Sequence, residues 1–143
     1  MAVTLTLSNH YKYQLMKKTI DLSADTLKII LMNDSFAFDK DAHATLSDVT
    51  SDQLSTANGY TQDDKTLANL SLSEDDTNDQ GKMTCDDVSW TASGGSIGPT
   101  GAAIIYDDTT GDDTVIGCID FGTDYTISDG SNFEIQNIEI TTG

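Results

Sequence analysis

Short apolar runs separated by turn residues fill the second half of the chain. The runs "TGAAIIYDD", "TVIGCIDFG", "YTISDG" and "NFEIQNIEI" follow one another between Thr100 and Ile140. Strands interrupted by turn signals about every 8–12 residues are typical of a β-sandwich or β-barrel. A chain of 143 residues fits one domain. We therefore expect an all-β fold, a single compact antiparallel sandwich or barrel-like domain over residues 1–143.

The N-terminal part adds one short helix to this strand pattern. Residues 3–7 alternate strictly between apolar and polar, and residues 25–33 are apolar at nearly every position, as in a strand covered on both faces. Between them, Ser8 or Asn9 is a candidate N-cap. We expect a strand and a short helix within about residues 1–20.

Two segments depart from regular alternation. Residues 34–64 are polar and long for a loop, which predicts an irregular excursion that docks on something. The odd spacing between Cys85 and Val88 predicts a β-bulge near Asp86–Asp87. The glycine-rich residues 92–101 lack the lysine of a phosphate-binding loop and predict a turn-rich connection.

The charge of the chain excludes several classes of partner. The net charge is −17, with seven lysines and no arginine. This acidic balance argues against nucleic acid and against an anionic membrane surface. The start of the chain lacks a signal-peptide pattern, and no run reaches the roughly 20 apolar residues of a membrane span. Because five of the lysines precede residue 41, we expect the N-terminal third to form a contact face.

Two acidic segments are candidate metal loops. The stretch 107–113 carries four aspartates but lacks the spacing of an EF-hand loop. A partial match runs from Asp76 to Asp87, with Gly81 in the correct place, but with Gln80 at a ligand position and no glutamate at the end. We expect both segments to be solvated turns, so no metal site is predicted.

Other candidate chemistry is sparse. Asp120 lies among apolar neighbours, but strand alternation favours a position of its side chain on the solvent-exposed face of the strand. A paired-carboxylate glycosidase site is therefore not expected. Cys85 and Cys118 are expected to be two buried thiols and not a disulfide, because the chain shows no secretion signal. No catalytic, cofactor-binding or metal-binding residues are predicted.

The aromatic residues of the strands have two readings. Trp90, Tyr106 and Phe121 are the residue types of a sugar-binding platform. Each of them lies in an apolar strand context, which favours packing in the core.

Several strand motifs together resemble a known group of proteins. The motifs are "DTLKIILMNDSF" (25–36), the "SDV…GY" region (47–60), "DDVSWTA" (86–92), "AAIIYDD" (102–108), "VIGCIDFG" (115–122) and "ISDGSNFEI" (127–135). In this order they resemble small structural proteins of tailed bacteriophages and prophages. The resemblance covers most of the chain from about residue 15.

The resemblance implies a capsid decoration (cement) protein on the virion exterior, made in the host cytoplasm. It implies the major capsid protein as partner and a homo-oligomer, often a trimer. We expect residues 1–20 and 34–64 to supply contacts, so deleting residues 1–8 should abolish capsid association and leave the fold. Other virion parts (tail, adaptor or fibre base), a host-surface or glycan-binding module, and an enzyme such as a depolymerase remain alternatives.

Overall fold

The computed structural model describes residues 5–143 as an all-β protein with two short α-helices, which confirms the expected class and its antiparallel pairing. The strands are β1 (Leu5–Leu7), β2 (Leu27–Asn33), β3 (Lys65–Thr66), β4 (Ser71–Asp75), β5 (Gln80–Thr84), β6 (Val88–Thr91), β7 (Ile97–Asp107), β8 (Val115–Ile127), β9 (Asn132–Ile135) and β10 (Glu139–Thr141). The helices are α1 (Asn9–Met16) and α2 (Leu46–Val49), and α2 continues into a 3₁₀ turn, η1 (Thr50–Asp52).

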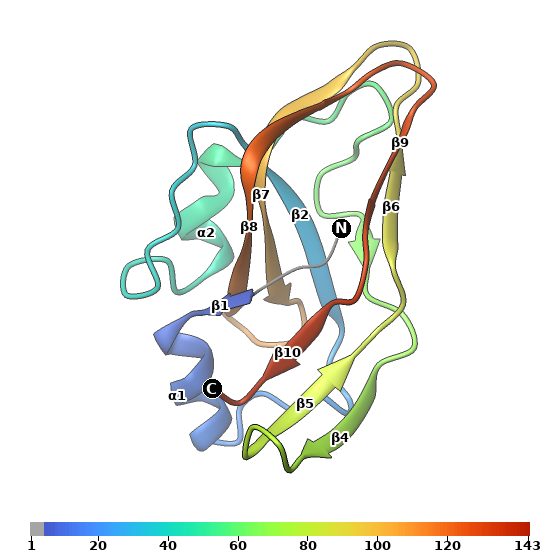
Figure 1. The fold of residues 1–143 in the computed structure, drawn as a ribbon. Coiled ribbons are helices and arrows are strands. Elements are labelled where there is room, and N and C mark those ends of the chain that lie inside the picture. The colour runs from blue at the N-terminus through green and yellow to red at the C-terminus, as the bar shows by residue number, and fades with distance from the viewer. Residues whose placement is uncertain (1–4) are drawn as a thin grey trace.

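One long antiparallel ribbon organises the second half of the chain. β7 pairs with β8, β6 with β9, and β5 with β10, so the three pairs are nested around the loop 108–114. Figure 1 shows the ribbon rising through β7 and β8, turning over at the top and returning through β6 and β9 to β10 and β5. The remaining strands join its edges, giving three sheets with the orders β1-β8-β7-β2-β3, β10-β5-β4 and β6-β9.

Glycines form the corner where the ribbon folds over. Gly94, Gly95, Gly98 and Gly130 all have positive φ. A Cβ at Gly98 would lie 2.6 Å from the backbone oxygen of Tyr125, so the two legs approach too closely there for any side chain. The turn-rich connection ends at Ser96, because the rest of the expected segment already belongs to β7.

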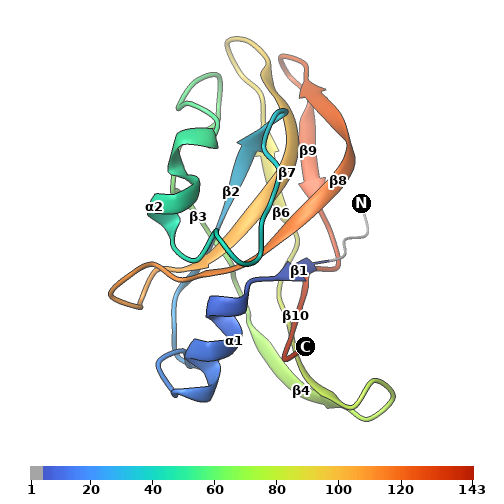
Figure 2. The same ribbon diagram turned by 90° about the vertical axis from the view of Figure 1, so that its left-hand side faces the viewer.

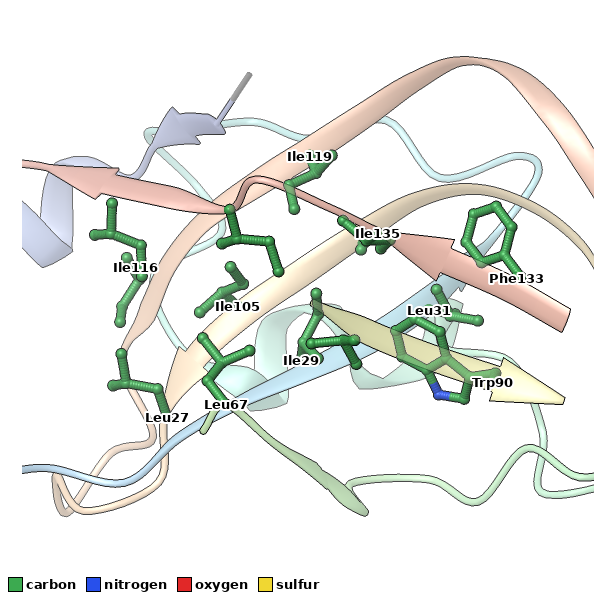
Figure 3. Packing of buried hydrophobic residues seen from close by; sticks show 14 of the residues in the cluster. Leu27, Ile29, Leu31, Leu67, Trp90, Ile105, Ile116, Ile119, Phe133 and Ile135 are labelled. Carbon is green, nitrogen blue, oxygen red and sulfur yellow. The ribbon is translucent and has the colours of Figure 1, made fainter. Parts of the chain in front are cut away.

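Folding the ribbon over places its far end on one face of the five-stranded sheet. Figure 3 shows side chains of both layers, Leu31 and Ile105 from the large sheet and Trp90 from β6, meeting in this main core. The large sheet contributes Leu27, Ile29, Leu31, Ala103, Ile105, Ile116 and Ile119, and the folded-over strands contribute Met83, Val88, Trp90, Phe133, Ile135 and Ile140.

The first part of the excursion 34–64 covers the opposite face of the large sheet, whereas its later residues Leu54 and Tyr60 pack on the main core. Phe36, Phe38 and Leu46 pack on a second cluster that includes Ile30 and Ile104. Figure 2 shows this segment, with α2, on the viewer's side of the sheet. β2 is therefore buried on both faces, as its sequence predicts. The surface on which the long excursion docks is the five-stranded sheet of the same chain.

The N-terminal helix begins where the sequence predicts. Ser8 is the N-cap of α1, and its Oγ accepts a hydrogen bond of 3.0 Å from the backbone N–H of Tyr11. The Ser8 hydroxyl also donates to the backbone oxygen of Val115, which ties the helix to β8. Of the expected strand 3–7, residues 3 and 4 lie outside the described residues, and the rest is β1.

The predicted bulge near Asp86–Asp87 is wrong. Residues 85–87 separate β5 from β6, and these two strands pair in different sheets. The odd spacing of the apolar residues therefore marks a change of sheet, after which the inward face begins again at Val88.

Core substitutions on the two faces of β2 test this double covering. Ile29 and Ile30 point to opposite faces and are 1% and 0% exposed. We expect Ile30→Ala and Ile29→Ala each to lower the free energy of unfolding by about 2–5 kcal/mol, because both substitutions leave a cavity. Urea denaturation monitored by circular dichroism measures the free energy of unfolding of each variant. A loss within about 0.5 kcal/mol for Ile30→Ala alone would contradict the covering of the second face.

Candidate functional site

The aspartates at the tip of the ribbon lie in different environments. Asp108 and Asp112 are exposed, whereas Asp107, the last residue of β7, is fully buried. The expectation of a wholly solvated turn is therefore wrong for Asp107. The physical reason is strand alternation, because Asp107 follows Ile105 by two residues and lies opposite Leu27 of β2.

Asp107 is held by the backbone of its own loop. One carboxyl oxygen accepts hydrogen bonds from the backbone N–H groups of Thr109 (2.9 Å) and Thr110 (3.3 Å). The other oxygen is buried without a hydrogen-bond partner among the described residues. Burial and the neighbouring Asp25 carboxyl raise the pKa of Asp107 to about 7. Because Asp107 has no exposed surface, it shapes the loop and presents nothing to a substrate.

The other acids of the tip make contacts within the molecule. His10 Nε2 of α1 lies 2.7 Å from a carboxyl oxygen of Asp112, and the Thr114 hydroxyl donates to the other oxygen at 2.6 Å. Lys28 Nζ lies 3.7 Å from Asp108. Burial and the crowded carboxylates raise the pKa of Asp113. The tip thus joins α1 and β2 to the ribbon.

The partial calcium-loop match does not assemble in space. Asn78 donates to the Asp75 carboxylate in the turn between β4 and β5. Asp87 lies beyond the far end of β5 and accepts from the backbone of Asn137. Within residues 5–143, no three His, Cys, Asp or Glu side chains form a group suited to a metal ion.

Asp120 lies on the exposed face, where alternation places it. Its carboxylate accepts a hydrogen bond from the backbone N–H of Gly122 at 2.9 Å. It stands at the rim of a hollow of about 300 Å³ between the large sheet and the excursion. Phe36, Phe38 and Cys118 help to line this hollow, so its walls are mainly apolar.

Both cysteines are free thiols, as predicted from the sequence. Cys118 is buried, as expected, whereas Cys85 is only half-buried and departs from the expectation. Burial raises the pKa of Cys85 to about 11 and that of Cys118 to about 12. The reactive thiolate form is therefore scarce at neutral pH.

The aromatic residues that resemble a sugar platform lie in the two cores. Trp90 and Tyr106 are buried in different clusters on opposite faces of the large sheet. Phe121 packs against the main core, and its ring centroid lies 5.4 Å from that of Phe133. The sequence prediction of core packing is confirmed.

An exposed apolar surface lies on α1, within the residues 1–20 that the sequence proposes as a contact segment. Met16 is 89% exposed and Tyr13 is 54% exposed, although both are large apolar residues. Lys12, Leu15, Met16 and Thr142 line a hollow of about 420 Å³ between the helix and the C-terminal residues. Thr142 also lines a smaller hollow beside Leu72, which is 50% exposed. We call this surface the α1 patch: Lys12, Tyr13, Leu15, Met16, Lys17, Leu72 and Thr142.

The lysine-rich N-terminal third explains the charge of this patch. Lys17 Nζ lies 5.0 Å from the centroid of the Tyr13 ring, a cation–π distance. Lys12 is exposed one helical turn from Met16. The patch is thus apolar at its centre and basic at its margin, in a chain of net charge −17.

The buried carboxyl at the ribbon tip gives a measurable pH dependence. The pKa of Asp107 is about 7 in the folded protein, above its ordinary value of 3.8. The contribution of the protonated Asp107 side chain to the free energy of unfolding is full below about pH 4 and is lost as the pH rises through about 7. Asp107→Asn should therefore raise the free energy of unfolding at pH 8 by about 1–3 kcal/mol and flatten its fall between about pH 4 and 7.

Urea denaturation at a series of pH values checks this prediction. Asp76→Asn, at an exposed aspartate in the turn between β4 and β5, is the matched control and should leave the dependence of the free energy of unfolding on pH unchanged. If the free energy of unfolding changes with pH equally in the wild type and in Asp107→Asn, Asp107 is ionised in the folded protein at little cost and the prediction is wrong.

No helix within the described residues is long and apolar enough to cross a membrane. Comparison of the chain with protein-family models, curated proteins and solved structures finds no match.

Proposed function

We propose that this chain is a non-enzymatic structural protein of a tailed-phage virion. In this proposal it decorates the outside of the head, binds the major capsid protein as a small homo-oligomer and stabilises the shell. The strand motifs that resemble small phage structural proteins favour this role. The observation that carries it is the α1 patch, the exposed apolar and basic surface on an otherwise acidic molecule whose central sheet is covered on both faces.

The composition supports the same role. A protein present in many copies on one particle must remain soluble at high local concentration, and a net charge of −17 provides this. Each contact with a repeating shell needs only modest affinity, because several contacts per oligomer raise the effective concentration.

The structure changes which segment we assign to the contact. The excursion 34–64 is used to cover the chain's own sheet, so its length needs no partner. The proposed deletion of residues 1–8 would remove buried Leu7 and the Ser8 cap of α1, so we expect it to destabilise the fold as well as to remove a contact. Point substitutions on the surface are the appropriate test.

The direct test is binding to assembled particles. We expect the purified chain to co-sediment with empty heads built from the major capsid protein of the same phage and to raise their melting temperature. Native mass spectrometry should show a small oligomer. A monomer that stays in the supernatant with heads, or one that binds only isolated tails, would contradict the decoration role.

A further inference from the structure

We infer that the α1 patch is the surface that docks on the head, and that its occupant is a protein surface with an apolar centre surrounded by carboxylates. This inference rests on the proposed function and names the contact that would perform it. Three properties of the patch support it: exposure, charge and size.

The apolar centre of the patch is open to solvent in the isolated chain. Met16 is 89% exposed at the end of α1, beside the hollow of about 420 Å³. A methionine side chain is flexible and polarizable, so it adapts to an irregular partner surface. Leu15 and Thr142 form the wall next to it. A partner side chain that enters this hollow would bury Met16 and Leu15 together.

The lysines at the margin of the patch favour a negatively charged partner. Within the part of the chain that the structure describes, Lys28 and Lys82 form ion pairs with carboxylates, whereas Lys12 and Lys17 do not. Both of these free lysines are exposed. Carboxylates on the partner would pair with them, and the acidic remainder of the chain would be directed away from such a surface.

The size of the patch argues against a second copy of this chain as the occupant. α1 has eight residues, which corresponds to a length of about 12 Å. A stable two-chain interface buries about 800 Å² on each partner, more than one short helix face offers. A two-fold contact centred on Met16 would also bring the Lys12 and Lys17 side chains of both copies together. A small patch suits a repeating shell, where several such contacts act at once.

The test compares head binding of three surface variants. Met16→Asp places a charge at the apolar centre and should weaken co-sedimentation with empty heads at least about tenfold. Lys12→Glu should also weaken binding, and added salt should weaken the binding of the wild type. Lys40→Glu makes the same charge change at an exposed residue of the excursion and should bind as the wild type does. Circular dichroism confirms that each variant is folded.

The outcomes separate this inference from the proposed function. If the wild type binds heads and Met16→Asp binds equally well, the α1 patch is not the contact, while the decoration role stands. If the wild type does not bind heads, both are overturned. If Met16→Asp instead dissociates an oligomer of the free chain, as seen by native mass spectrometry, the patch is a contact between copies and this inference fails.

Discussion

The pairing of β7 with β8 is the contact on which the other layers depend. Its register sets Ile104 opposite Cys118 and Ile105 opposite Gly117, and so decides which side chains face each core. β6–β9 and β5–β10 continue the same two legs beyond register shifts of the β7–β8 pair between Ile97 and Ala102. A slip of one residue would exchange the two faces of a strand. It would turn Tyr106 toward the main core and move Gly117 away from β1, where a Cβ at this position would lie 2.5 Å from the backbone oxygen of Thr6.

Much of this arrangement is predictable from the sequence, because it depends on local patterns. Apolar runs bounded by turn residues predict β7 and β8, a nearly continuous apolar run predicts β2, and Ser8 predicts the start of α1. Alternation assigns side chains to faces but does not say which strands share a sheet. The break at residues 85–87 therefore resembled a bulge. The sequence predicts that β2 is covered on both faces, but it does not identify the covering segment, because Phe36 and Phe38 lie in an irregular part of the chain.

The same limit applies to the candidate sites. The four aspartates of residues 107–113 form one acidic group in the sequence. Their environments in the fold differ, because these depend on alternation within β7 and on contacts from distant elements. The burial of Asp107 follows from its spacing to Ile105, which is a signal present in the sequence. The exposure of Met16 also has a signal, because helical spacing places it one turn from the exposed Lys12, whereas Leu15 lies one turn from the buried Tyr11.

The α1 patch gains its suitability for docking from the way in which the helix is anchored. Ser8 joins the start of α1 to β8, and His10 joins its first turn to Asp112 at the ribbon tip. Tyr11 is fully buried on the inner side, and its hydroxyl donates to the backbone of Thr141. The exposed side of the helix is therefore held in place before any partner arrives. A surface ordered in advance loses less conformational entropy on binding, so a small contact can retain a larger share of its interaction energy.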